Sequence, residues 1–165
     1  MITQHELKES LTYDPVTGQF IWLAPSKFSN IKPGSIAGSL KHDGYVQVKV
    51  RGKRYYAHRL AWLYMSGEFP KNFIDHIDGN KANNSWINLR EATNAQNQRN
   101  SKMNVKNTSG VKGVSWHKKS HKWQAHIGLE DGRNKNLGSF NSIEEAKKVV
   151  EEYRSKLHGE FANHG

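Results

Sequence analysis

A polar stretch in the middle of the chain carries the side chains best suited to chemistry. Asp75 and His76 set a carboxylate beside an imidazole directly after Ile74, and Asp78-Gly79 follows. An Asp-Gly pair adopts positive φ at little cost, so we expect it to fold two short extended segments back on each other, with Asp75 and His76 ending the first. A carboxylate can bind a metal ion, and an imidazole can move a proton near neutral pH.

A short helix is expected next. Thr93-Asn94-Ala95-Gln96 matches a capping box, in which the Thr93 and Gln96 side chains bind exposed backbone amides and start a helix. Asn97 then lies on the first helical turn, and the order of two strands and a helix turns it back toward Asp75 and His76. Carboxylate and carboxamide oxygens suit a hard cation such as Mg²⁺ or Mn²⁺.

Asparagine-rich loops have a simpler explanation, because Asn is common in solvated turns. Each of these residues taken singly is more often structural than catalytic, and only their combined spacing favours a site. We interpret Asn80, Asn83 and Asn84 as turn and backbone-capping residues first, with Asn84 the best placed to support the site.

The combined spacing resembles the HNH (ββα-metal) nuclease motif, in the variant whose last position is Asn. Asn88 stands twelve residues after His76, and Asn97 nine further on; the Asp-Gly turn and the Asn88-Leu89 pair agree as well. The resemblance implies that His76 is the general base and that Asp75 and Asn97 hold one ion, Mg²⁺ or Mn²⁺. It further implies that Asn88 ties the turn to the opposite backbone and orients His76 for catalysis.

Composition limits the remaining choices. With 165 residues, 35% of them hydrophobic, and a mean hydropathy of −0.84, two small modules fit better than one large core. The absence of cysteine excludes disulfides and thiolate zinc sites. No apolar run reaches membrane-spanning length and residues 1–6 do not resemble a signal peptide, so we expect a soluble, cytoplasmic protein of a phage or bacterial host, with no membrane partner and no small-molecule cofactor.

The net charge of +10 is unevenly distributed. Residues 1–73 hold ten Lys and Arg against five acidic residues, residues 74–100 three against three, and residues 101–165 twelve against seven. Two basic flanks around a neutral centre favour a protein that grips phosphates on either side of its site. A basic protein with scattered, solvated lysines remains the alternative.

Residues 1–57 read as an antiparallel sheet module. Strands at 11–13 and 19–22 flank a turn at 14–18, and a hairpin joins residues 44–50 to 54–56. Basic residues crowd this hairpin, opposed only by Asp43. We interpret the module as a β-rich DNA-binding extension, although an edge strand protected by lysines has the same pattern. The candidate DNA contacts are Lys49, Arg51, Lys53 and Arg54.

The nuclease core is predicted to span residues 58–100. It opens with a helix over 58–65 that ends at Gly67 as a C-cap, with its apolar residues in the core. Arg59 is a candidate phosphate contact, and we expect His58 to cap or pack. The polar, aperiodic residues 101–110 read as a linker, in which Lys102 is a further candidate DNA contact.

Residues 111–165 show three short strands and a helix. The strands fall at 113–116, 122–127 and 135–140, and a second capping box at 142–145 opens a helix. Its apolar positions, expected to form a core stripe against the sheet, are Ala146, Val149, Val150, Tyr153 and Leu157. Residues 101–135 hold eight basic against two acidic residues and residues 136–165 four against five, so the strands are expected to face the polyanion.

This half resembles the DNA-binding domain of plant Apetala/ethylene-response factors, which lays a three-stranded sheet in the major groove. The likeness rests on Gly113-Val114, Trp123, Ile127, residues 137–140 and 144–146. Ser115, Gly128 and Asn136 replace base-reading positions, so the docking mode carries over but the target sequence does not. Trp123 fits core and contact equally. The candidate contacts are Lys112, Trp116, Lys118, Lys122, Gln124, His126 and Arg133.

The sequence therefore predicts an α+β protein: an antiparallel sheet module leading into a ββα-metal nuclease core, then a small three-stranded sheet with a helix. We expect a site-specific endonuclease that hydrolyses double-stranded DNA by a one-metal HNH mechanism, by nicking or by double-strand cleavage, and a homing role in a phage or mobile element. A non-cleaving, sequence-specific DNA-binding regulator on an HNH scaffold is the alternative. Whether it acts as a monomer or homodimer stays open.

Overall fold

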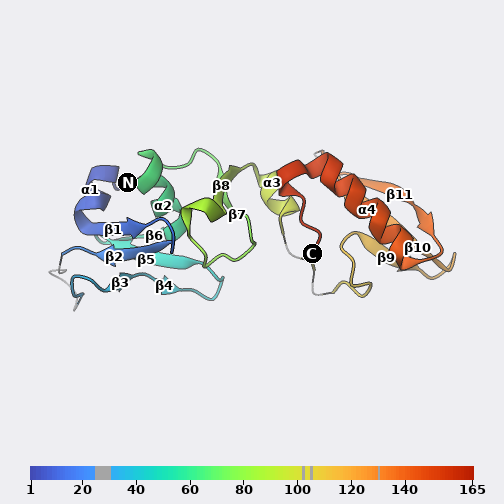
Figure 1. Cartoon of the computed structure of the whole chain (residues 1–165), viewed down its shortest axis with the longest axis horizontal. Helices are drawn as coiled ribbons and strands as arrows, with labels where there is room; N and C mark the ends of the chain where they lie inside the picture. Colours follow the sequence, from blue (N-terminus) through green and yellow to red (C-terminus); the bar gives the residue numbers. More distant parts are fainter. Residues whose placement is uncertain (25–30, 102, 105, 130) are drawn as a thin grey trace. The chain divides into compact units, whose positions relative to one another are not determined.

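The computed structural model describes residues 1–165 except 25–30, 102, 105 and 130. It is a mixed helix and sheet protein, 29% helical and 30% strand, so the predicted α+β class is confirmed. The chain divides into two compact units, residues 1–93 and 94–165 (Figure 1). None of the helices in the described ranges has the length and apolar character needed to cross a bilayer.

The first unit contains three helical segments and eight strands among its described residues. In chain order they are α1 (Gln4–Ser10), β1 (Leu11–Asp14), β2 (Gln19–Trp22), β3 (Ile36–Ala37), β4 (Ser39–Leu40), β5 (Val46–Val50), β6 (Lys53–Tyr56), α2 (Ala57–Ser66), β7 (Phe73–His76), the 3₁₀ turn η1 (Trp86–Asn88) and β8 (Leu89–Ala92). The strands pair as β1-β2-β3, β4-β5-β6 and β7-β8.

Helix α1 is an addition to the predicted sheet module. Its N-cap Thr3 accepts a hydrogen bond from the Glu6 amide, and the Glu6 carboxylate accepts one from the Thr3 amide at 2.9 Å. This capping box satisfies amides that the first turn leaves without partners. The Thr-x-x-Glu spacing at residues 3–6 is therefore the sequence signal that could have located the helix.

Both predicted hairpins of the sheet module are present. Strands β1 and β2 pair antiparallel from Leu11 opposite Trp22, and β5 pairs β6 from Gln47 opposite Tyr56. Their inward positions bury Phe20 and Val48, which are 1% and 0% exposed. Helix α2 packs on the same core and ends, as predicted, at Gly67 in the left-handed region.

The second unit begins with a short helix and continues as a sheet covered by a long helix (Figure 1). Its elements are α3 (Asn94–Arg99), β9 (Val114–His117), β10 (Lys122–Gly128), β11 (Asn134–Phe140), α4 (Ile143–His158) and η2 (Gly159–Phe161). The sheet order is β11-β10-β9. Ser142 caps α4 by accepting a hydrogen bond from the Glu145 amide at 3.1 Å. Helix α3 lies in this unit, whereas the predicted nuclease core extended to residue 100. The predicted domain limits remain predictions.

The buried face of α4 differs from the predicted stripe. Ala146 and Val150 are fully buried as expected, but Tyr153 and Leu157 are 40% and 39% exposed. The buried positions continue instead at four-residue intervals through Arg154 and His158. The exposed Tyr153 ring instead contacts the Lys135 amine, which lies 4.8 Å from the ring centroid.

Gly18 offers a test of how tightly the first unit is packed. A Cβ at Gly18 would lie 2.3 Å from the backbone of Asn84 and Ser85, and its φ is +73°. Gly52 has a similar φ of +79° with nothing within 4 Å. We expect Gly52→Ala to lower the free energy of unfolding by about 1 kcal/mol, and Gly18→Ala by at least about 3 kcal/mol. Urea denaturation measures both, and equal losses would contradict the close approach.

Candidate active site

Strands β7 and β8 position the predicted catalytic pair (Figure 1). They pair antiparallel, with Asp75 opposite Arg90 and His76 opposite Leu89. Asp75 and His76 end the strand buried, at 3% and 4% exposure. The prediction that they end the first of two antiparallel segments is confirmed. The partner strand, however, begins only at Leu89, after a connection of residues 77–88 in which Gly79 has a φ of +66°.

The carboxylate of Asp75 is held by an arginine that the sequence analysis did not single out. Arg90 Nε donates to Asp75 Oδ2 at 2.9 Å, and Arg90 Nη2 forms an ion pair with the same oxygen at 2.8 Å. A buried carboxylate is costly unless a charge and hydrogen bonds compensate it, and Arg90 supplies both. The sequence could indicate Arg90 only through the strand register, because a hairpin that places His76 opposite Leu89 also places Asp75 opposite Arg90.

Asn88 braces the connection between the strands. Its Oδ1 accepts from the Asp78 amide at 3.0 Å, and its Nδ2 donates to Asp78 Oδ1 at 3.0 Å and to the Asn83 carbonyl at 2.8 Å. The Ile77 amide donates to the Asn88 carbonyl at 2.9 Å. These bonds tie the two ends of the connection together, and the orienting role of Asn88 toward His76 stays a prediction. Although burial raises the pKa of Asp78, hydrogen bonds from Asn83, Asn80 and Asn88 hold it below its usual value.

Asn84 selects the tautomer of His76. The Asn84 Nδ2 donates to the Ala82 carbonyl at 3.0 Å, which turns Oδ1 toward His76 Nε2, 3.2 Å away. A carboxamide oxygen only accepts, so the neutral imidazole carries its proton on Nε2 and its basic lone pair on Nδ1. Burial lowers the pKa of His76, while Asn84, Asp78 and Asp75 act in the opposite direction. His76 is therefore neutral near pH 7.

Two hydrogen bonds with the first hairpin hold the backbone around Asn84. The Tyr13 hydroxyl donates to the Asn84 carbonyl at 2.6 Å, and the Trp86 amide donates to the Pro15 carbonyl at 2.8 Å. Gly18 contributes by leaving room for the backbone at residues 84–85. The turn between β1 and β2 thus fixes the residue that orients His76, a role that the sequence did not reveal.

Aromatic rings surround His76 on one side. The His58 ring lies 5.1 Å from it edge-on, and Tyr45 lies 5.9 Å away. Tyr56 stacks on His58 at 5.5 Å. Burial, followed by the neighbouring His76 and Arg59, lowers the pKa of His58 to about 3. His58 thus packs as a neutral ring, as expected.

Two further basic groups border this cluster. Lys81 lies over the Tyr45 ring at 4.7 Å and donates to the Asp43 carbonyl at 3.1 Å. Arg59 donates to the Pro70 carbonyl at 3.4 Å and lies 5.9 Å from the Phe69 ring. Its phosphate contact stays a prediction. The sequence analysis did not single out Lys81, whose position became apparent only with the fold.

The predicted DNA contacts of the β5–β6 hairpin differ in their surroundings. Lys49, Lys53 and Arg54 are exposed. Arg51 instead pairs with Glu6 and Glu9 of α1, each at 2.8 Å. The expectation that only Asp43 opposes the basic residues is therefore wrong, because α1 brings two further carboxylates to this hairpin.

The remaining candidates lie in or beside the second unit. Asn97 is on α3, and its pairing with Asp75 remains a prediction. Lys112 donates its amine to the Arg99 and Ser101 carbonyls. Trp116, Lys118, Lys122 and Arg133 are exposed, while Gln124 and His126 are half-buried; Arg133 pairs with Asp131. Half-buried Trp123 packs against the core, and Lys102 lies outside the described residues.

Comparison with known proteins agrees with this geometry. Residues 55–99 match the model of a family described as HNH endonuclease. Protein 3.8 of Escherichia phage T7 is 39% identical over 106 residues, which are 64% of this chain and 86% of that protein. The chain belongs to the HNH endonuclease family. The uncharacterized HNH endonuclease L560 of Acanthamoeba polyphaga mimivirus is 33% identical over 64% of this chain and 54% of its own length.

A solved structure described as DNA binding and cleavage by the HNH homing endonuclease I-HmuI is also similar to this HNH family member. The two chains are 24% identical, the TM-score is 0.44, and the match covers 86% of this chain and 77% of the other.

The donor groups at the HNH motif fit a hard divalent ion. The described residues contain no cluster of three or more His, Cys, Asp and Glu side chains. An ion beside Asp75 would therefore take its other ligands from carboxamide, phosphate or water oxygens. Mg²⁺ is commonly bound in this way, through one or two carboxylates with substrate phosphates and retained waters. A soft metal would find no thiolate here, because the chain has no cysteine.

The burial of His58 predicts how the stability of the first unit changes in acid. An unfolded histidine titrates near 6.5 and His58 near 3 when folded, so between these values only the unfolded chain binds the proton. Stability is therefore complete above about pH 6.5 and falls as pH decreases. We expect His58 to lower the free energy of unfolding by about 2 kcal/mol at pH 5 relative to pH 7.5.

Urea unfolding of three proteins at both pH values measures this effect. His58→Phe keeps an aromatic ring but removes the proton site, so its acid loss should be smaller than that of the unmodified chain. His42→Gln, at an exposed position, should keep the full loss. The same acid loss in all three proteins would contradict the assigned burial of a neutral His58.

Proposed function

We propose that this protein is a site-specific endonuclease that hydrolyses double-stranded DNA, either nicking one strand or cutting both. Family membership and a buried carboxylate–imidazole pair on a strand end support a nuclease. Basic, exposed residues in both units support a polyanionic substrate. The single observation that carries the proposal is the Asn84 contact to His76 Nε2, because it sets the basic lone pair on Nδ1.

In this mechanism His76 is the general base. Its pKa is lowered by burial, so the ring is unprotonated near pH 7 and its Nδ1 takes the proton from the attacking water. Asn84 holds the Nε2 proton, and Asn88 keeps the connecting loop folded beside the ring. Arg90 pairs with the Asp75 carboxylate and orients it.

Asp75 and Asn97 would hold one Mg²⁺ or Mn²⁺. Such an ion supplies Lewis acidity to the scissile phosphate and to the leaving 3′ oxygen when bound. The two residues lie in different units, and the proposal that they share an ion is supported by the family match over 55–99, which contains both.

The proposed biological role is homing in a phage or mobile element, and the relatives from a phage and a giant virus support it. DNA as substrate implies action inside the host cell. The DNA is gripped by Lys49, Lys53, Arg54 and Arg59 in the first unit. In the second it is gripped by the β9–β11 face through Trp116, Lys118, Lys122, Gln124, His126 and Arg133.

His76→Ala tests the chemistry. Loss of a general base lowers a rate by roughly 10²–10⁴, so we expect cleavage of supercoiled plasmid with Mg²⁺ to fall by that factor. DNA affinity, measured by gel shift with chelator present, should stay within about threefold. His42→Ala, at an exposed position in the same unit, should cut normally. If affinity fell as far as cleavage, His76 would not be the base; binding without any cutting by the unmodified chain would instead indicate a regulator.

Lys122→Ala tests which face of the second unit meets DNA. Lys122 is exposed on β10, and Lys147 is exposed on α4 near Glu151. A lost phosphate contact lowers affinity and reduces the slope of log K against log salt by about 1. We expect this for Lys122→Ala and not for Lys147→Ala in fluorescence anisotropy across a salt series. The reverse result would put the helix, not the strands, against the DNA.

A further inference from the structure

Helix α3 carries the last residue of the HNH motif but belongs to the second compact unit. The family match ends at residue 99, the last residue of α3, whereas the second unit begins at residue 94. A helix of six residues is too short to be stable alone in water. Asn97 therefore depends on whatever fastens α3 within the second unit.

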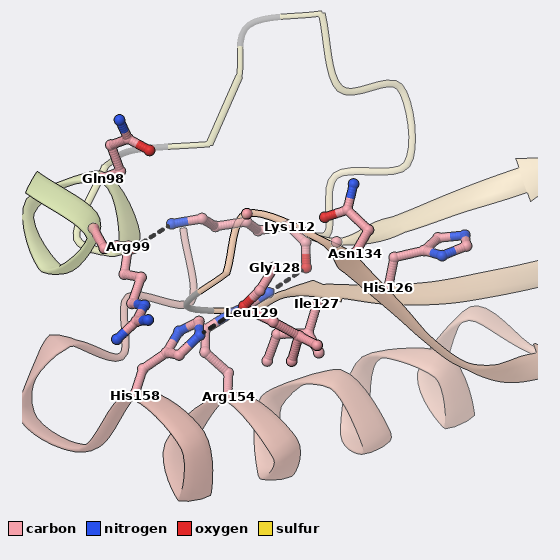
Figure 2. A pocket seen from close by; sticks show the side chains of 13 residues that line it. Gln98, Arg99, Lys112, His126, Ile127, Gly128, Leu129, Asn134, Arg154 and His158 are labelled. Carbon is pink, nitrogen blue, oxygen red and sulfur yellow. Dashed lines mark hydrogen bonds between the residues drawn. The ribbon is translucent and has the colours of Figure 1, made fainter.

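Lys112 fastens the end of α3. Its amine donates to the Arg99 carbonyl at 3.0 Å (Figure 2) and also to the Ser101 carbonyl. The last carbonyls of a helix have no partners within it, and a cation at this end also offsets the helix dipole. One lysine thus stabilises the end of the helix two residues beyond Asn97.

Arg154 holds Lys112 in turn. It is 3% exposed on α4, and its Nη2 donates to the Lys112 carbonyl at 2.6 Å. Gly113 makes this approach feasible, because a Cβ there would lie 2.6 Å from the His126 carbonyl and 3.2 Å from Arg154 Nη2. The chain at residues 112–113 is therefore clamped against β10 and α4.

The C-terminal tail adds a second fastener. Asn163 donates through Nδ2 to the Asn100 carbonyl at 2.8 Å and to Asn100 Oδ1 at 3.2 Å. Asn100 is 6% exposed and follows α3 directly. Two segments of the second unit thus bond directly to the end of α3, the approach to β9 and the tail, and α4 acts on it through Lys112.

A cavity of about 800 Å³ lies at this junction, lined by Gln98, Arg99, Lys112, Arg154 and His158 among others (Figure 2). Its basic lining could take a phosphate. However, Lys112 and Arg154 already donate to backbone carbonyls. Burial and the nearby Arg154 lower the pKa of Lys112 to about 8, which leaves most of its amines charged near pH 7. These bonds favour a structural role over an anion site, and we call the bonds from Arg154 to Lys112 and from Lys112 to the end of α3 the bracket.

We propose that Lys112 is a positioning residue of the nuclease, through which the C-terminal unit holds α3 and its metal ligand Asn97 in place. The C-terminal unit is then part of the catalytic apparatus as well as a DNA-binding module. This inference rests on the proposed function for its effect on cleavage, and on the bonds at α3 for its structural part.

Lys112→Met tests the bracket with two readouts. The first is hydrogen exchange at the Asn100 and Ser101 amides, which donate to the Gln96 and Gln98 carbonyls. The second is the Mg²⁺ concentration that gives half-maximal cleavage. Loss of a residue that orients a metal ligand typically weakens metal use by 10–100-fold. We expect at least about tenfold faster exchange at both amides and an about tenfold higher Mg²⁺ requirement, with DNA affinity within about threefold.

Lys112→Arg, which keeps a donor at this position, should restore most of both readouts. Lys148→Met removes an exposed lysine from α4 and should change neither. Asn163→Ala removes the second fastener and should accelerate exchange at Asn100 to a smaller extent. If Lys112→Met fails to fold, Asn163→Ala tests the fastening of α3 in its place.

Unchanged exchange in Lys112→Met and in Asn163→Ala would overturn the proposal. So would a loss of DNA affinity and of salt dependence in Lys112→Met without a change in exchange, because Lys112 would then be a phosphate contact. If the unmodified chain cleaved no DNA, the proposed function would fail, and hydrogen exchange would still test the bracket.

Discussion

The register of β7 against β8 is the constraint on which the candidate site depends. Pairing Asp75 with Arg90 brings a guanidinium to a carboxylate that is almost fully buried. A shift of one residue would turn each β7 side chain to the other face of the sheet and leave the Asp75 carboxylate without its cation. The same register brings Asn88, just before β8, close enough to His76 for its side chain to brace the connecting loop. One strand pairing therefore sets the charge balance and the orientation of the site together.

Burial around His76 affects the protonation of its ring as well as the packing of the core. His58 and Tyr45 pack against one side of the ring and shield it from water, and Tyr56 stacks on His58. The exclusion favours the uncharged imidazole, while Asn84 decides which nitrogen carries the proton. Two weak effects thus act on one imidazole: desolvation favours its uncharged form, and a carboxamide orients it. The first hairpin is needed because Tyr13 of β1 holds the Asn84 carbonyl.

The sequence predicted local elements well and spatial neighbours less well. The hairpins, the Gly67 cap and the strands of the second unit follow from turn residues and alternation, which act over a few positions. Arg90, Lys81 and the Tyr13 contact to Asn84 depend on pairings between distant segments, so no local pattern could identify them. Tyr153 and Leu157 were assigned to the core because helical spacing was extended too far. The α4 face instead buries Arg154 and His158, which contact the Lys112 and Gly128 carbonyls through Nη2 and Nε2.

The Asp75–Arg90 pair also bears on how an ion would be held. With Arg90 bonded to Asp75 Oδ2, the local charge of the pair is close to zero, and a divalent ion approaching Asp75 meets a positive guanidinium nearby. Such an arrangement binds a cation weakly by itself. A DNA phosphate would add the missing negative charge and further oxygen ligands, so ion binding and DNA binding should strengthen each other. A nuclease built in this way would hold its ion firmly only when DNA is in place, which would limit hydrolysis of phosphates that its basic surfaces do not grip.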